Sequence, residues 1–135
     1  MRVVIDTNVF VSSFFGGKPR QIIDLWRDGK LIWCLTRPIV DEYVRVLSRM
    51  GLENADGLHA LLTLFADGPN ILYSAKTPRI TIITEDPDDD KFLEAALALN
   101  CTVIISGDKH LLKVGSYMGI QILSPAAFLA EMDEG

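Results

Sequence analysis

The sequence predicts an α/β fold in which a mainly parallel sheet is covered by helices on both faces. The first observation is that short apolar runs, typical of buried strands, alternate with amphipathic helical patterns along the whole chain. The second is the length, because 135 residues correspond to one domain. The third is that no repeat, low-complexity segment or long linker divides the sequence. We therefore expect a single domain over residues 1–135.

The first third of the chain contains two predicted strands with helical segments between them. An apolar run begins directly at the N-terminus, and Thr7 or Asn8 is placed to cap the helix that follows. Two glycines and a proline interrupt the next apolar segment, and a turn at residues 28–30 ends the second helical pattern. The predicted elements are a strand at Arg2–Ile5, an apolar helical segment at Val9–Phe15, a helix at Arg20–Arg27 and a strand at Leu31–Leu35.

A longer helix is predicted to begin after Thr36, which would cap it, and to end near Met50. Pro38 falls in its first turn, where a missing backbone N–H costs least. Apolar residues recur at helical spacing and define its inward face, which consists of Ile39, Val40, Tyr43, Val44 and Leu47.

The rest of the chain continues the alternation of helices and strands. The segment from residue 68 to residue 85 is the least regular, with two prolines and two short β-like runs. The expected elements are a helix at about Ala55–Ala66, β-like runs at Ile71–Tyr73 and Ile80–Thr84, a helix at Lys91–Leu99, a strand at Thr102–Ser106, a helical turn at His110–Val114, a strand at Ile120–Leu123 and a helix at Pro125–Met132.

Composition excludes several classes of protein. A net charge of -5 and a pI near 4.9 exclude a protein that wraps nucleic acid by charge alone. No apolar stretch is long enough to span a bilayer, and the N-terminal segment does not fit a signal peptide. Cys34 and Cys101 lack CxxC spacing and are expected to be reduced core thiols. We expect a cytoplasmic protein.

The charge is unevenly distributed along the chain. Residues 1–50 carry a net charge of +3, and residues 51–135 carry -8. One interpretation is a chance distribution over a solvated surface. The other is that the first half contacts an anionic substrate through Lys18, Arg20, Arg27, Arg37, Arg45 and Arg49.

Two aspartates follow apolar strands at opposite ends of the chain. Asp6 comes directly after Val3–Ile5, and Asp108 follows the segment Val103–Ser106 and a glycine. The carboxyl ends of parallel strands line one crevice, where ligands bind. Two carboxylates at that edge indicate a site for a hard metal ion. The structural alternatives are a helix cap for Asp6 and a simple turn for Asp108.

One carboxylate of the Thr36–Met50 helix is a further candidate. Glu42 borders the apolar stripe, since Ile39 lies three residues before it. Asp41 instead has Arg45 four residues later, as in a solvated ion pair. Glu42 is therefore the better candidate for a site.

An acidic run, Glu85 to Asp90, precedes the helix predicted at Lys91–Leu99. One or two acids would suit the positive end of a helix dipole, but several adjacent aspartates repel one another unless a cation offsets their charge. Asp89 shares a helix face with apolar residues and should point toward the core. Asp90 is turned about 100° away at ~3.6 residues per turn. Asp89 is the preferred ligand, with Asp90 and Asp86 as alternates.

Together these motifs resemble the PIN-domain ribonucleases. The resemblance rests on the segment from Val3 to Asn8, on Glu42, on the acidic run ending in Lys91-Phe92, and on Ile105 to Asp108. It covers nearly the whole chain and looks like the subgroup that contains toxins of toxin–antitoxin pairs. It implies a three-layer α/β/α sandwich and cleavage of single-stranded RNA by metal-activated water.

The resemblance also implies roles for individual residues. Asp6, Glu42, Asp89 and Asp108 would be the acidic quartet that binds one or two Mg²⁺ or Mn²⁺ ions. Thr7, Asn8 and Ser106 would be supporting polar groups, and Arg20, Arg37, Lys109 and His110 are weaker candidates for substrate contacts. The implied partners are RNA, a cognate antitoxin and a second copy of the chain.

Two other functions remain possible at this point. One is a PIN-like module that binds RNA or protein without cutting. The other is a different Mg²⁺-dependent phosphoryl-transfer protein, such as a receiver domain or a phosphatase, although no DxDx[TV] loop follows the first strand.

Overall fold

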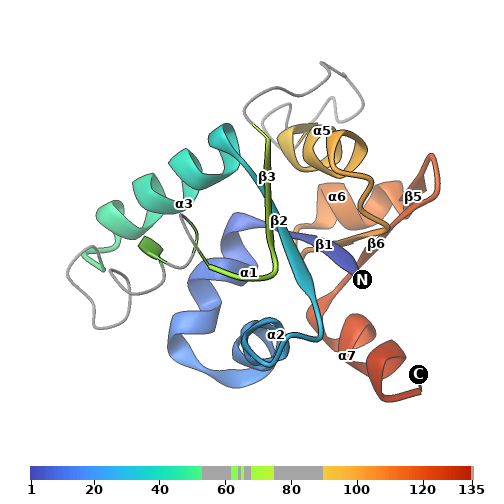
Figure 1. Ribbon diagram of the computed structural model, residues 1–135, viewed down its shortest axis with the longest axis horizontal. Coiled ribbons are helices and arrows are strands. Elements are labelled where there is room, and N and C mark those ends of the chain that lie inside the picture. The colour runs from blue at the N-terminus through green and yellow to red at the C-terminus, as the bar shows by residue number, and fades with distance from the viewer. Residues whose placement is uncertain (53–61, 64, 66–67, 75–89, 135) are drawn as a thin grey trace.

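A single six-stranded sheet forms the centre of the computed structural model, which describes residues 1–52, 62–63, 65, 68–74 and 90–134 (Figure 1). The strand order is β3-β2-β1-β4-β6-β5. All neighbours are parallel except β5, which runs antiparallel to β6. The strands are β1 (Arg2–Ile5), β2 (Ile32–Thr36), β3 (Ile71–Ser74), β4 (Val103–Ile105), β5 (Ser116–Tyr117) and β6 (Ile120–Leu123). The predicted α/β fold is confirmed.

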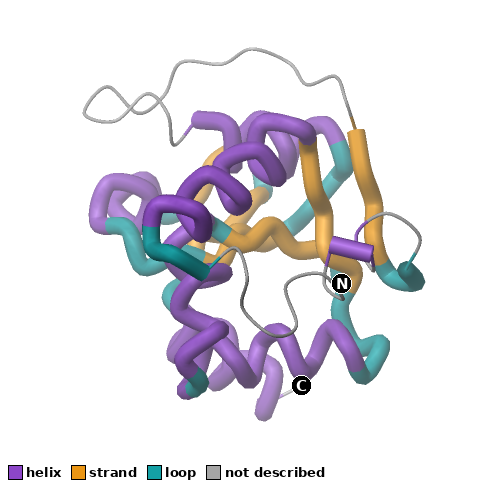
Figure 2. The backbone as a smooth tube through the Cα atoms, turned by 90° about the vertical axis from the view of Figure 1, so that its left-hand side faces the viewer, coloured by secondary structure: helices purple, strands orange, loops and turns teal. Residues whose placement is uncertain are grey.

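Helices cover both faces of this sheet. The helices are α1 (Thr7–Ser12), α2 (Gly17–Arg27), α3 (Arg37–Arg49), α5 (Asp90–Ala98), α6 (Lys109–Val114) and α7 (Pro125–Glu134), with a 3-10 turn at Ser13–Phe15. The helices α1 and α2 lie on one face with α7, and α5 and α6 lie on the other (Figure 1). Figure 2 shows the strands between the helical layers from a second direction. This is the arrangement that right-handed crossovers between parallel strands produce.

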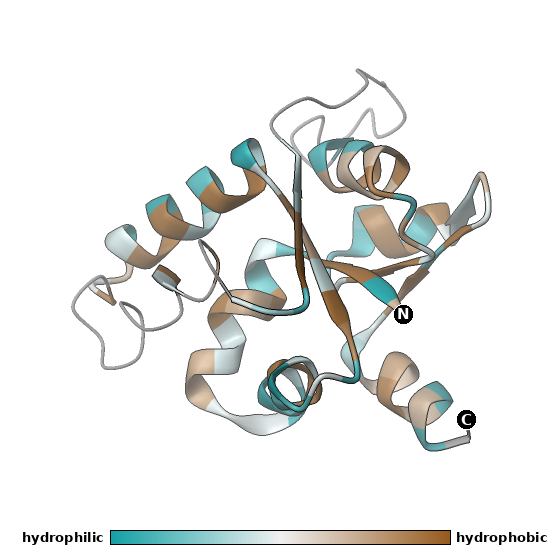
Figure 3. Ribbon diagram, in the orientation of Figure 1, coloured by the Kyte–Doolittle hydropathy of each residue, from teal (hydrophilic) through white to brown (hydrophobic). Residues whose placement is uncertain are grey.

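The core lies between the sheet and the helices. Figure 3 shows apolar strands at the centre, while α3 presents hydrophobic and hydrophilic residues on different sides. An aromatic cluster fills the α1–α3 side, where the Phe10 and Tyr43 rings stack with their centroids 4.1 Å apart. Trp33 packs edge-on against Trp26 and Phe65 in the same cluster. Because these rings come from five segments of the chain, they hold α1, α2 and α3 against β2.

Most element boundaries differ from the predictions by one to three residues. The clearest difference at the start of a helix is α2, which begins at Gly17. Thr36 ends β2 and precedes α3, but its side chain makes no capping bond, and its buried hydroxyl has no partner in the described part of the chain. Val44 is 38% exposed rather than inward-facing. The short strand β5 was not predicted.

Some predictions fall on residues that the structure does not describe. The predicted strand Ile80–Thr84 lies outside the described residues. Of the predicted helix at about Ala55–Ala66, residues 62, 63 and 65 are described, and these three are helical.

Both cysteines are free and buried, as predicted. The Cys101 thiol is hydrogen-bonded to Cys34 and lowers the pKa of the Cys34 thiol. The same contact, followed by burial, raises the pKa of Cys101. In the described segments, no helix is long and apolar enough to cross a membrane.

The register of the two central strands determines where polar side chains meet. Ile5 of β1 pairs with Ile105 of β4, so Asp6 and Ser106 follow them at the same edge of the sheet. The backbone N–H of Asp6 donates to the Ile105 carbonyl at 3.0 Å and extends the pairing by one step. Residues 100 positions apart in sequence are therefore neighbours at the carboxyl ends of the strands.

Candidate functional site

Asp6 is the most buried acid of the site and has two well-defined contacts. Its side chain is 2% exposed. One carboxylate oxygen accepts the Val9 N–H at 2.8 Å, so Asp6 is the N-cap of α1 in place of Thr7 or Asn8. The other oxygen accepts a hydrogen bond from the Ser106 hydroxyl. These bonds fix the carboxylate at the end of β1.

Asp108 is connected to Asp6 through Ser106. The Ser106 oxygen accepts the Asp108 N–H at 2.9 Å. The Asp108 carboxylate caps α6, accepting the N–H groups of His110 at 2.7 Å and Leu111 at 3.4 Å. Ser106 therefore links the caps of two helices. Asp6 has the capping role that was its structural alternative, whereas Asp108, for which a simple turn was the alternative, also caps a helix.

Asp6 is a buried acid whose pKa is raised above its ordinary value. Burial raises the pKa of Asp6 most, and the nearby Asp108 charge raises it further, while bonds from Ser106 and Val9 lower it. In the described segments, neither Lys nor Arg forms an ion pair with Asp6 or Asp108. Among the described residues, no cationic side chain therefore balances the charge of these two acids.

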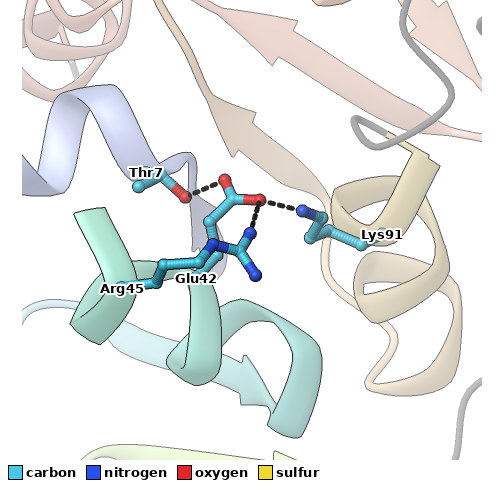
Figure 4. Close-up of polar contacts among 4 residues, drawn as sticks. All are labelled: Thr7, Glu42, Arg45 and Lys91. Carbon is cyan, nitrogen blue, oxygen red and sulfur yellow. Dashed lines mark hydrogen bonds and ion pairs between the residues drawn. The ribbon is translucent and has the colours of Figure 1, made fainter. Parts of the chain in front are cut away.

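Glu42 differs from Asp6 and Asp108 because it has cationic partners (Figure 4). Its Oε1 accepts the Thr7 hydroxyl at 2.5 Å. Its Oε2 is ion-paired with the Lys91 ammonium and lies 3.6 Å from Nη2 of Arg45. Arg45 was expected to pair with Asp41, but Asp41 pairs with Arg37 instead, at 3.8 Å.

Tyr43 connects the Glu42 helix to the strand that carries Asp6. Its hydroxyl donates to the carbonyl of Ile5, the residue before Asp6. Burial raises the pKa of Tyr43 strongly, and the charges of Asp6 and Glu42 add to the effect. Tyr43 therefore stays a neutral donor between the two acids.

Among the acids of the run, the structure describes Asp90, whereas Asp86 and Asp89 lie outside the described residues. Asp90 is the first residue of α5 and is 4% exposed. The expectation that helix register turns Asp90 away from the interior is therefore wrong. Its burial makes Asp90 a stronger candidate than the sequence suggested.

A divalent cation fits the described residues only in part. Within the described segments, no group of three or more His, Cys, Asp or Glu side chains is close enough to hold a metal ion. Asp6 and Asp108 fit a hard cation in donor type and in unbalanced charge. Glu42 fits in donor type, but Lys91 and Arg45 occupy its Oε2.

The remaining predicted site residues are distributed over α1, α2, α3 and α6. Asn8 is exposed on α1, and Lys109 is exposed beside Asp108. The Arg20 guanidinium donates to the carbonyls of Ser13 and Phe14, at 2.6 and 3.2 Å, which gives it a structural role. His110 contributes its backbone N–H to the Asp108 cap.

Two residues of the site, Tyr43 and Lys91, were not predicted to belong to it. Tyr43 was assigned only to the apolar stripe of α3, whereas Arg45 was named both as a partner of Asp41 and as one of six basic residues that could contact an anionic substrate. Lys91 follows the acidic run directly, and a lysine after several adjacent acids was the available signal. Its partner Glu42 lies 49 residues away in sequence, a contact that local patterns do not reveal.

Comparisons with known proteins agree with this fold. Residues 2–110 match a family model described as PIN domain. An uncharacterized protein of Methanocaldococcus jannaschii, MJ1680, is 29% identical over an alignment of 153 positions, which covers 99% of this chain and 93% of that protein. The match to the family model includes every acid discussed above.

Proposed function

Since the chain belongs to the PIN-domain family, we propose that it is a divalent-metal-dependent endoribonuclease that hydrolyses phosphodiester bonds of single-stranded RNA. The observation that carries this proposal is the buried Asp6 carboxylate, which lies beside Asp108 with no cationic partner in the described segments. A buried carboxylate of this kind is costly unless a cation binds it. In this proposal the cation is Mg²⁺ or Mn²⁺.

The chain's own groups hold the acids in place before any ligand arrives. Backbone N–H groups at the starts of α1 and α6 orient Asp6 and Asp108, and the Ser106 hydroxyl ties the two loops together. The Thr7 hydroxyl donates to Oε1 of Glu42 and orients that carboxylate. A bound Mg²⁺ or Mn²⁺ supplies a water of lowered pKa and positive charge beside the scissile phosphate.

Basic residues near the acids suit an RNA backbone. Arg45 is 59% exposed beside Glu42, Arg37 is exposed at the start of α3, and Lys109 is exposed beside Asp108. These side chains come from elements that contribute the acids. We propose that they contact phosphates on either side of the cleaved bond.

We also propose that the protein is the toxin of a toxin–antitoxin pair, that it acts in the cytoplasm as a homodimer, and that a cognate antitoxin inhibits it. The toxin assignment rests on the sequence motifs that resemble that subgroup. Co-expression with the product of an adjacent small gene, followed by copurification and loss of RNA cleavage, is the expected outcome of a test. The alternative is a PIN-like module that binds RNA or protein without cutting.

The test of the nuclease is cleavage of a fluorescent single-stranded RNA in Mn²⁺, in EDTA, and after Mn²⁺ is restored. The wild type should cut only with metal, and Asp6→Asn and Asp108→Asn should each lower the rate by at least tenfold. Asp24→Asn is the matched control, because Asp24 is an exposed acid on α2. Cleavage in EDTA would contradict the proposal, and RNA binding without cleavage would support the alternative.

A further inference from the structure

Lys91 is the nearly buried cation of the site. Its side chain is 13% exposed, and that of its ion-pair partner Glu42 is 16% exposed. Lys91 is the second residue of α5, while Glu42 lies on α3 (Figure 4). The pair therefore spans two helices that flank the carboxyl ends of the central strands.

The following inference rests on the proposed function. We propose that Lys91 is an internal cation whose ammonium is ion-paired with Oε2 of Glu42 in the metal-free protein. A divalent ion would bind Glu42 only when it displaces the Lys91 ammonium. Lys91 is thus a positioning residue that keeps Glu42 in place before metal binds and sets the affinity of the complete site. Asp6 and Asp108 have no cationic partner in the described residues, so metal binding at these two acids would need no such displacement.

The first support is the contact pattern of Glu42. Thr7 satisfies Oε1, so Oε2 is the oxygen that a metal would take. That oxygen is the one bound by Lys91 and approached by Arg45. A divalent ion and an ammonium group at the same oxygen repel each other, and the repulsion is strong where solvent is largely excluded.

The second support is the uneven distribution of charge among the acids. Asp6 and Asp108 have no cationic partner in the described residues, whereas Glu42 has two. Glu42 is thus the acid of the three whose carboxylate is already ion-paired in the absence of metal. The four-carbon stem of lysine has several rotatable bonds, so the ammonium can leave without movement of α5.

The third support comes from comparing the two cations. Arg45 is 59% exposed and its nitrogen lies 3.6 Å from Oε2, which describes a weakly held surface pair. Lys91 is largely shielded from solvent and bonds directly to the same oxygen. Lys91, rather than Arg45, should therefore be the main competitor of a metal ion for Oε2 of Glu42.

The test measures metal binding directly, by titration calorimetry with Mn²⁺, and thermal stability in EDTA. Lys91→Met should lower the melting temperature in EDTA, because Glu42 loses its shielded partner. The same variant should bind Mn²⁺ about tenfold more tightly, a change of about 1.4 kcal/mol. The specific expectation is that Lys91→Met lowers the melting temperature but raises the affinity for Mn²⁺. If Lys91 were purely structural, its substitution would change only the melting temperature.

Matched variants separate Lys91 from a general effect of charge. Lys18→Met removes the same side chain from an exposed position of α2 and should leave both measurements unchanged. Arg45→Met should raise Mn²⁺ affinity by less than Lys91→Met does. Lys91→Arg keeps a cation at the position and should not reproduce the gain of Lys91→Met.

A measurement on the wild type keeps the inference testable if Lys91→Met does not fold. Addition of Mg²⁺ should shift the ¹³Cε and ¹⁵Nζ resonances of Lys91 as its ammonium leaves Glu42, while those of Lys18 stay in place. Unchanged Lys91 resonances at saturating Mg²⁺ would overturn the inference. Unchanged or weaker Mn²⁺ binding by a folded Lys91→Met would do the same.

Failure of the proposed function has a different signature. If the wild type and Lys91→Met both bind Mn²⁺ with the expected difference but neither cuts RNA, the nuclease proposal fails and the role of Lys91 stands. If neither protein binds Mn²⁺ while both are folded, both proposals fail. Binding by Lys91→Met alone supports the displacement model in its strongest form.

Discussion

At the residue scale, Asp6 combines a structural role with a carboxylate that no cation of the described residues neutralises. It caps α1 and accepts the Ser106 hydroxyl, yet it is buried beside a second carboxylate. The sequence predicted both the acid and its position, because an aspartate directly after an apolar strand is costly without a partner. It could not show that Ser106 supplies the partner, since that contact joins residues 100 positions apart.

Asp6→Asn should stabilise the metal-free protein at neutral pH, by an amount on the order of 1 kcal/mol. Burial, followed by the Asp108 charge, raises the pKa of Asp6 above its ordinary value of 3.8. The folded state therefore holds the Asp6 proton more tightly than the unfolded state does. As the pH rises from 3.8 through the higher pKa that Asp6 has in the folded protein, the wild type loses stability. The advantage of Asp6→Asn should grow over the same range.

The measurement is urea unfolding in EDTA at several pH values, compared between the wild type and the variant. Asp24→Asn serves as the control and should follow the wild type at every pH, because its side chain is exposed. A variant that is less stable than the wild type at pH 7 would show that the hydrogen bonds outweigh burial. Saturating Mn²⁺ should reverse the order, because only the wild type gains binding energy.

Tyr43→Phe should lower the free energy of unfolding by about 1–2 kcal/mol, because the Ile5 carbonyl loses its buried donor. The stacked contact with Phe10 is retained, so packing should change little. Urea denaturation measures the loss, with the exposed Tyr73→Phe as the control. Equal effects of the two substitutions would contradict a specific role for the Tyr43 hydroxyl.

At the element scale, the sequence predicted which helices and strands exist but not how their ends are oriented. Periodicity located α3 and α5 within one or two residues. It failed for Asp90, because side-chain direction at a helix start depends on the residue where the helix begins and on what it packs against. Thr36 shows the same limit, since it precedes α3 without making the expected capping bond.

Asp90→Asn should weaken Mn²⁺ binding by about 10- to 100-fold, if the buried acid at the start of α5 contributes to the metal site. Asp86→Asn and Asp89→Asn, measured in the same titration, decide which acid of the run is the third principal ligand. Circular dichroism should show the same helix content in all three variants. If only Asp89→Asn weakens Mn²⁺ binding, the role of Asp90 is purely structural.

At the scale of the whole molecule, the order of the strands brings acids from distant parts of the chain to one edge. The sequence predicted this convergence, because alternating strands and helices imply a parallel sheet whose carboxyl ends align. It could not predict the ion pair of Lys91 with Glu42, which depends on how α3 and α5 approach each other. Oligomeric state, and binding of the proposed antitoxin, would also depend on surfaces that sequence patterns do not define.

Affinity for single-stranded RNA should fall with salt, despite the net charge of -5. If Arg37, Arg45 and Lys109 each contact a phosphate, the slope of log affinity against log salt should be about -2. Fluorescence anisotropy with the inactive Asp6→Asn protein measures the slope between about 50 and 200 mM salt. Arg45→Gln should reduce its magnitude by about 0.7, while Lys30→Gln, in an exposed turn, should leave it unchanged.

The central position of β1 has a consequence for how the protein is made. On the ribosome, Asp6 emerges early, but the strand that completes its surroundings consists of residues 103–105. Until that strand is synthesised and inserts beside β1, the Ser106 hydroxyl and the Asp108 carboxylate are absent. A growing chain therefore cannot assemble the proposed centre until residues 103–108 have been synthesised and β4 has paired with β1.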